Sequence, residues 1–170
     1  MRLSRIFATI AILAVLLTAH NRLTNHTQVY AQFGLSAPPP ESASSIPAAQ
    51  LMQPDELNRM LHAKSASKPL MLQVGSHMLF AQAHIAGSEY AGAGSQSEGL
   101  NQLRTRVALL PRNTFIVLYC GCCPWSRCPN VGSAFKLLRD MGFTNVKVLY
   151  LANNLGADWV DKGYPVERGQ

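Results

Sequence analysis

The chain has 170 residues, of which 48% are hydrophobic and 14% are charged, and its formal net charge is +6. This length suits one domain with an appendage, and the hydrophobic fraction allows a buried core. The 15 Lys and Arg residues are scattered and form no aromatic-basic stripe, which argues against a nucleic-acid-binding protein.

The N-terminal segment has the pattern of an export signal. Two basic residues in MRLSR precede an uncharged, mostly apolar run from Ile6 to Ala19. This run is shorter than the roughly 20 residues that cross a bilayer, but it fits the apolar region of a signal peptide. We therefore expect residues 1–31 to be a signal peptide or an uncleaved membrane anchor, and the protein to be periplasmic or secreted.

A linker and a single domain are expected after this segment. Residues 32–45 are rich in Pro, Ala and Ser and cannot bury much surface, which is typical of a linker. The folded domain is then expected over residues 46–170.

Helical and extended patterns alternate in the first half of this domain. Residues 53–64 place Pro54 in a first helical turn, with Leu57, Met60 and Leu61 at helical spacing. The following patterns predict a buried strand over 68–75, a turn or short helix and then a long loop over 76–97, and a helix over 98–110.

The strongest strand pattern lies in NTFIVLYC, residues 113–120. Phe115 to Tyr119 run without a polar interruption, which is typical of a strand buried on both faces of a parallel sheet. A helix over 131–143, a strand over 145–152 and a final turn or helix follow. The alternation indicates an open α/β sheet, in which ligands bind at the carboxyl ends of strands. Cys120 lies at such an end.

All four cysteines lie in the stretch YCGCCPWSRCPN, residues 119–130. One interpretation is a metal or iron–sulfur site, although zinc sites usually bring two separated ligand pairs. A second is one or two structural disulfides, which would close only small loops in an oxidising compartment. A third is a reactive thiol with neighbours. The cysteines concerned are Cys120, Cys122, Cys123 and Cys128.

The third interpretation makes Cys120 the nucleophile, because the preceding strand fixes its position. Backbone N–H groups of the loop and the N-terminus of the following helix would stabilise its thiolate and lower its pKa. Arg127 would add a positive charge and a forked hydrogen bond to the anion.

Three segments resemble a rhodanese-like domain. HIAGSEY (84–90) resembles the family's GHIPGA turn, and ADWVDKGYPVERG (157–169) resembles its C-terminal ending. FIVLYC, the loop and GSAFKLLRDMGFTNVKVLYL resemble the strand, active-site loop, helix and strand around the family's catalytic cysteine. Together these segments cover roughly residues 46–169.

The resemblance implies an α/β domain with a central, mostly parallel sheet flanked by helices. It also implies a sulfurtransferase without a cofactor, which carries sulfane sulfur as a persulfide on Cys120 and passes it to a small-molecule or protein thiol. The alternative is a soft-metal-binding or dithiol–disulfide redox module built from the four cysteines. The resemblance also implies an active-site loop that contains seven candidate residues, namely Gly121, Cys122, Cys123, Trp125, Ser126, Arg127 and Cys128.

The chain departs from the family pattern beyond its extra cysteines. Gln73 and Gly75 stand where the family's first core strand usually ends in a DxR-like segment, and NNLGAD replaces the GG before the last Trp. We expect His84 and Trp159 to be structural. Trp125 is expected to be either an apolar lid over the cysteine or a surface on which a substrate stacks.

Overall fold

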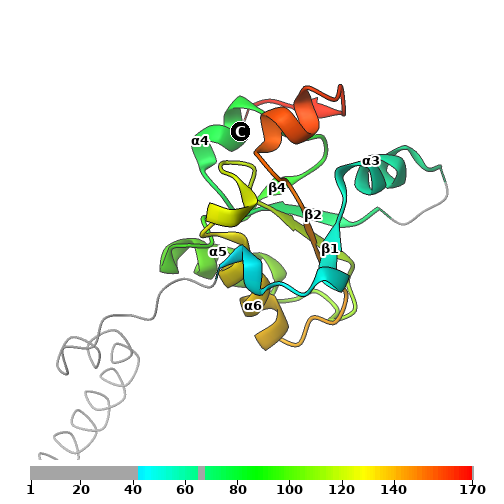
Figure 1. Ribbon diagram of the computed structural model, residues 1–170. Coiled ribbons are helices and arrows are strands. Elements are labelled where there is room, and N and C mark those ends of the chain that lie inside the picture. Colours follow the sequence, from blue (N-terminus) through cyan, green and yellow to red (C-terminus); the bar gives the residue numbers. More distant parts are fainter. Residues whose placement is uncertain (1–41, 65–67, 170) are drawn as a thin grey trace, which may run out of the picture. The chain divides into compact units, whose positions relative to one another are not determined.

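The computed structural model of the protein describes residues 42–64 and 68–169 (Figure 1). The segment expected to be a signal peptide or anchor, residues 1–31, and the linker up to residue 41 lie outside the described residues. Among the described residues, no helix is both long enough and apolar enough to span a membrane.

Five parallel strands form the central sheet, in the order β1-β6-β5-β2-β4. The central strand β5 pairs with β2 and β6, so that Leu118 lies opposite Leu72 on one side and Val148 on the other. This confirms the predicted α/β fold with a parallel sheet. The strands are β1 (Leu51–Met52), β2 (Leu70–Gln73), β4 (Glu89–Tyr90), β5 (Ile116–Tyr119) and β6 (Val146–Leu149).

Helices cover both faces of this sheet (Figure 1). On one face, Ile116 and Leu118 of β5 share a hydrophobic cluster with residues of α5 and α6. On the other face, Val117 and Tyr119 pack with residues of α3 and of the π-helical turn η4. The predicted burial of β5 on both faces is therefore confirmed. The helices are α3 (Pro54–His62), α4 (His77–Gln82), α5 (Ser97–Val107), α6 (Val131–Asp140) and η4 (Gly156–Val160).

Short elements complete the domain. β3 (His84–Ile85) pairs antiparallel with β7 (Val166–Glu167), and the 3-10 turns η1 (Ala43–Ser45) and η2 (Ala48–Gln50) precede β1. Ala43 is buried in the same cluster as α6, so residues 42–45, expected in the linker, include a part of the core.

The carboxyl ends of β2 and β5 meet at one edge of the sheet, and the pairing continues past both strands. The Val74 N–H donates to the Tyr119 carbonyl at 2.8 Å. The backbone directly before Cys120 is therefore held by the sheet up to the point where the cysteine loop begins.

Candidate functional site

The cysteine loop connects β5 to α6 and is fastened to the segment after β6. The Leu155 N–H donates to the Gly121 carbonyl at 3.0 Å, and the Trp125 N–H donates to the Ala152 carbonyl at 3.1 Å. Gly121 has a φ of +77°, and a Cβ at this position would lie 2.9 Å from the Leu155 Cβ. Glycine is thus required here both by the left-handed backbone and by the close approach of Leu155.

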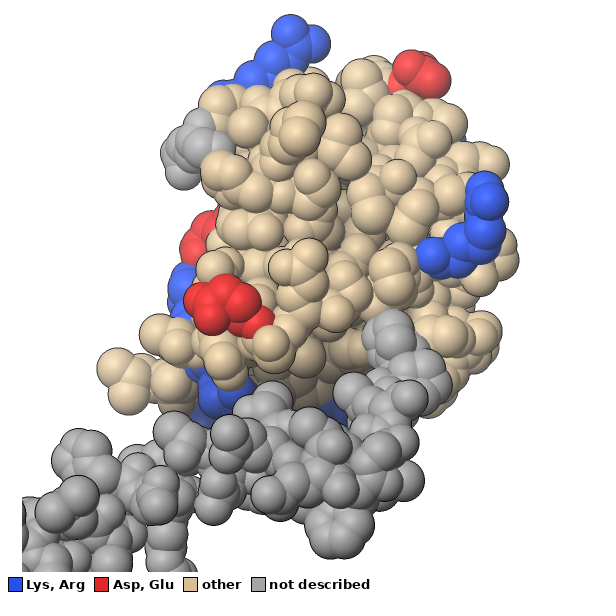
Figure 2. All heavy atoms as spheres, turned by 90° about the vertical axis from the view of Figure 1, so that its left-hand side faces the viewer, with Lys and Arg blue, Asp and Glu red and all other residues tan. Residues whose placement is uncertain are grey.

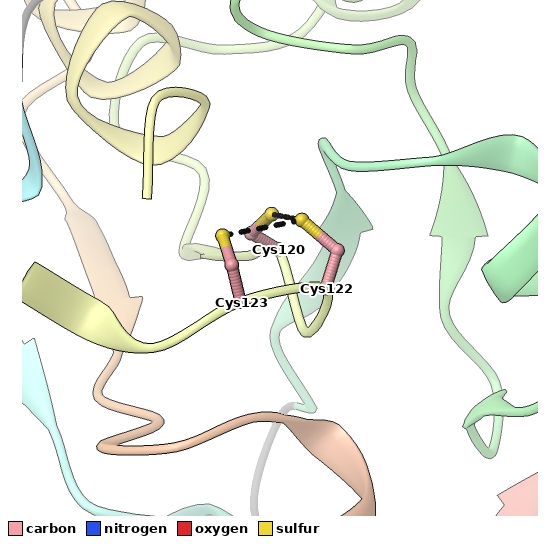
Figure 3. Close-up of side chains that lie close together, drawn as sticks. All are labelled: Cys120, Cys122 and Cys123. Atoms are coloured by element: carbon pink, nitrogen blue, oxygen red, sulfur yellow. Dashed lines mark hydrogen bonds between the residues drawn. The ribbon is translucent and has the colours of Figure 1, made fainter. Parts of the chain in front are cut away.

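The cysteine sulfurs converge inside this loop (Figure 3). The Cys120 Sγ lies 3.0 Å from the Cys122 Sγ, which lies 3.3 Å from the Cys123 Sγ. All four cysteines, including the buried Cys128, are free thiols. The sulfurs of Cys120, Cys122 and Cys123 all lie within 4.8 Å of one another, and no described histidine joins them.

Asn130 is a site residue that sequence reasoning missed. Its Nδ2 donates to the Cys120 Sγ at 3.2 Å and, more weakly, to the Cys122 Sγ at 3.8 Å. Its Oδ1 accepts the Ser95 N–H at 3.0 Å, which fixes the amide so that the NH₂ group faces the sulfurs. In the sequence, Asn130 resembles an ordinary N-cap of α6, but its side chain makes no capping hydrogen bond.

Gln73 and Gly75 hold the backbone of Cys120. The Gln73 Nε2 donates to the Cys120 carbonyl at 2.8 Å, and its Oε1 accepts the Gly75 N–H at 3.1 Å. A Cβ on Gly75 would lie 2.8 Å from the Cys120 carbonyl oxygen and 3.0 Å from its Sγ. The residues that depart from the family's DxR-like segment therefore contact the candidate nucleophile directly.

Hydrogen bonds within the cluster separate the pKa values of the thiols. The Cys120 S–H donates to the Cys122 sulfur and lowers the pKa of Cys122 to about 6. The pKa of Cys128 is likewise lowered to about 6, first by the Cys120 S–H and then by the N–H groups of Val131 and Asn130. The pKa of Cys120 is raised, because ionisation would remove the proton that it shares with both neighbours. Burial raises the pKa of Cys123 to about 12.

These contacts differ from the sequence-based expectation. The N-terminus of α6 was expected to stabilise a Cys120 thiolate, but its N–H groups are directed at Cys128 instead. Cys120 is buried, whereas Cys122 is half-buried. Within the described part of the chain, the exposed Arg127 makes no side-chain hydrogen bond or ion pair.

The remaining candidates have structural contacts. The Trp125 ring packs at 5.1 Å from the Tyr150 ring and lines a small gap together with Cys120, Cys123 and Cys128. His84 stacks on a phenylalanine ring at 3.9 Å and bonds the carbonyl of the same residue, Phe80. Ser126 of the turn η3 (Trp125–Arg127) is exposed.

Two larger pockets lined by described residues also reach the thiols. A pocket of about 260 Å³ is lined by Gln73, Cys120, Cys122, Leu155 and residues of α4 and η4. A second, of about 350 Å³, is lined by Cys122, Asn130 and polar residues near the starts of α4 and α5. Cys122 lines both pockets. Among the described residues that line them there is no Lys, Arg, Asp or Glu, and the side of the molecule on which α4 and α5 lie has a broad uncharged area (Figure 2).

Comparisons with known proteins identify the class of fold. No protein-family model and no curated protein matches the sequence. The solution structure of the rhodanese-like domain of Alr3790 from Anabaena sp. is 22% identical, covers 70% of this chain and 79% of its own, and has a TM-score of 0.52. A crystal structure of Alr3790 is 21% identical over 69% of this chain and 92% of its own, also with a TM-score of 0.52.

A third solved structure, of BH2092 from Bacillus halodurans, is 19% identical, covers 69% of this chain and 75% of its own, and has a TM-score of 0.54. At these identities the likeness concerns the fold. The chain therefore has a rhodanese-like α/β fold that carries a cysteine-rich loop at the carboxyl end of its central strand.

Proposed function

We propose that this domain is a sulfurtransferase that takes up sulfane sulfur as a persulfide in its cysteine loop and passes it to a thiol. The observation that carries the proposal is the position of the Cys120–Cys122 pair. The two thiols lie at the carboxyl end of β5, in a rhodanese-like fold, and both line the pocket of about 260 Å³.

Within this pair, the contacts favour Cys122 as the thiol that attacks the donor. It is half-buried and lines both pockets, and hydrogen bonds from its neighbours hold its pKa at about 6. A thiolate is the nucleophilic form of cysteine. Cys120, which the family resemblance makes the carrier, lies behind it in a buried position.

The uptake step follows from these positions. The Cys122 thiolate attacks the outer sulfur of a persulfide R–S–SH, the S–S bond of the donor breaks, and the thiolate RS⁻ leaves with the electron pair. Anionic sulfur at this site accepts hydrogen bonds from the Asn130 amide and the Cys120 S–H. The step needs no cofactor and no change of net oxidation state.

The donor that best suits the pockets is a small organic persulfide. The described residues that line the two pockets include no Lys or Arg, so a dianion such as thiosulfate would lose hydration without gaining an ion pair to either side chain. We therefore place organic persulfides before thiosulfate as donors.

The test uses two variants that each keep one candidate carrier. Reduced Cys120→Ser and Cys122→Ser proteins are treated with glutathione persulfide, and their peptides are mapped by mass spectrometry. We expect Cys120→Ser to gain about 32 Da, one sulfur atom, on Cys122, and Cys122→Ser to gain none. An adduct on Cys120 in Cys122→Ser would show that Cys120 is the residue that carries the sulfur. If both folded variants stay unmodified, the proposed function is wrong.

Soft-metal binding is a second candidate function, because three thiol sulfurs lie within 4.8 Å of one another. Thiolates in this arrangement suit Cu(I) or Zn(II). Anaerobically purified protein would then bind about one metal ion per chain, and Cys123→Ser would lose it. Retention of metal by Cys123→Ser, or no binding by the wild type, would argue against a three-thiolate site.

We also propose export of the protein, on the pattern of residues 1–31. A fusion of these residues to alkaline phosphatase, which is active only after export, tests this. An inactive fusion that accumulates in the cytoplasm would contradict it. A thiol acceptor, small molecule or protein, is then to be sought outside the cytoplasm, and a membrane contact would arise only through an uncleaved N-terminal segment.

A further inference from the structure

Cys120 and Cys122 form the closest pair of thiols in the loop, with 3.0 Å between their sulfurs. Gly121 between them has a φ of +77°. This left-handed backbone brings the two side chains to the same side of the loop, where their sulfurs face each other (Figure 3). The loop is fixed in this shape by the hydrogen bond from the Leu155 N–H to the Gly121 carbonyl.

We propose that Cys120 is the thiol that resolves the persulfide formed on Cys122, so that the reaction ends in free sulfide and a Cys120–Cys122 disulfide. The domain would then be a reductive sulfane-sulfur transferase that draws its electrons from an external dithiol. This inference rests on the proposed uptake of sulfur. It adds the product of the reaction, sulfide, and the class of reductant, a dithiol.

The step balances within the loop. The Cys120 Sγ attacks the inner sulfur of the Cys122 persulfide, Cys122–Sγ–SH, and the new Sγ–Sγ bond forms as the bond to the outer sulfur breaks. The outer sulfur leaves with the electron pair and the Cys120 proton, as hydrogen sulfide. Two electrons pass from the two cysteine thiols to the sulfane sulfur, which is reduced while the thiols are oxidised to a disulfide.

Cys120 is better placed for this attack than Cys123. The Cys123 sulfur also lies near Cys122, at 3.3 Å, but adjacent residues have Cα atoms about 3.8 Å apart across a trans peptide. Disulfides usually need about 4.4–6.8 Å. One intervening residue removes this restriction for Cys120 and Cys122, and here that residue is a glycine.

The resulting disulfide remains accessible for reduction. Cys122 lines both pockets, so an external dithiol can attack its Sγ and release Cys120 as a thiol. Reduction of the mixed disulfide by the second thiol of the reductant restores the loop. A reaction that forms organic persulfides must therefore precede this one, and a dithiol-regenerating reaction must support it.

The experiment is a single turnover without reductant. Reduced, metal-free protein in excess is mixed with glutathione persulfide. Sulfide is trapped with monobromobimane, and the protein is mapped by mass spectrometry. For the wild type we expect about one sulfide per sulfur taken up and a mass loss of about 2 Da located to Cys120 and Cys122. For Cys120→Ser we expect the persulfide to stay on Cys122, with at least a tenfold loss of sulfide.

The outcomes separate this inference from the function on which it rests. A wild-type protein that keeps a stable persulfide without sulfide refutes the inference and leaves the proposed function intact. Sulfide release by Cys120→Ser, or its loss in Cys123→Ser, would assign the resolving thiol to Cys123. If neither wild type nor Cys120→Ser takes up sulfur, the proposed function itself fails. Far- and near-ultraviolet circular dichroism checks that each variant is folded.

Discussion

Two amide side chains lie beside the candidate thiols in this molecule. The Asn130 amide faces the Cys120 sulfur, and the Gln73 amide bonds the Cys120 carbonyl. Stabilisation of an anionic sulfur here depends on hydrogen bonds from amides, backbone N–H groups and other thiols, which require short distances and fixed orientations. Small changes in these groups should therefore change thiol reactivity more than stability.

The first prediction concerns the pH dependence of Cys122. Because its pKa is lowered to about 6, it should be mostly thiolate at pH 7, and its alkylation rate should fall about tenfold per pH unit below pH 6. Iodoacetamide labelling followed by peptide mapping measures this rate. In Cys120→Ala, which lacks the main S–H donor, the midpoint should move up toward the ordinary value of 9.0. A wild-type midpoint near that value would contradict the assignment.

The second prediction concerns Asn130. In Asn130→Asp the carboxylate can still accept the Ser95 N–H, but it replaces an N–H donor with a negative oxygen beside the sulfurs. This raises the pKa of the neighbouring thiols, so Cys122 labelling at pH 7 should slow by about tenfold or more. The matched change Asn145→Asp, on an exposed residue, should leave the rate unaltered. Equal labelling rates in the two variants would show that Asn130 does not influence the Cys122 thiol.

At the scale of elements, the end of β2 and the residues after it contact the start of the cysteine loop, where the loop leaves β5. Gly75 is the point of closest approach, because any Cβ there would overlap the Cys120 carbonyl oxygen and crowd its Sγ. Gly142, after α6, differs: its φ is +87°, yet a Cβ would meet nothing within 4 Å. Two glycines at element ends thus serve different purposes.

The third prediction compares these glycines. Gly75→Ala should lower the free energy of unfolding by about 1–3 kcal/mol through overpacking and should also alter Cys120 and Cys122 labelling. Gly142→Ala should cost about 1–2 kcal/mol through its left-handed backbone and leave thiol labelling unchanged. Urea unfolding and iodoacetamide labelling of both variants measure this. A Gly75→Ala protein with wild-type labelling would show that Cys120 tolerates the added methyl group.

The long elements could be predicted from the sequence and the short ones could not. α3 and α6 have clear apolar periodicity and β5 is an unbroken apolar run, whereas β1, β3, β4 and β7 are each two residues long and too short to show either pattern. The position of Cys120 at a strand end was predicted in the same way. The roles of Gln73 and Asn130 could not be predicted. They depend on hydrogen bonds with Cys120, 47 positions from Gln73, and with Ser95, 35 positions from Asn130.

At the scale of the whole molecule, the sheet separates two hydrophobic clusters, and Trp159 belongs to the one on the η4 side. Its ring is fully buried, and its Nε1 donates to the Pro165 carbonyl at 2.9 Å. This bond connects η4 to the segment leading into β7. The expectation that Trp159 is structural is confirmed.

The fourth prediction follows from this burial. Trp159→Ala should lower the free energy of unfolding by about 3–5 kcal/mol, the usual cost of removing a large buried aromatic residue. Leu109→Ala, at a position that is 98% exposed, should change it by less than about 0.5 kcal/mol. Denaturant unfolding measures both. A small effect of Trp159→Ala would mean that the η4 side of the core collapses to fill the space.

The uncharged lining of the two pockets also determines how a donor reaches the thiols. Clefts lined by one sign of charge concentrate oppositely charged ligands and accelerate association by about 10–10³-fold, an advantage that salt removes. The described lining residues include no Lys, Arg, Asp or Glu, so no such side chain there attracts an anionic donor to the Cys122 thiolate. The second-order rate constant for uptake from glutathione persulfide should therefore not fall as the Debye length is reduced from about 30 Å to about 3 Å. A steep fall with salt would contradict this. The protein would then take up sulfur at least as fast in saline as in dilute surroundings.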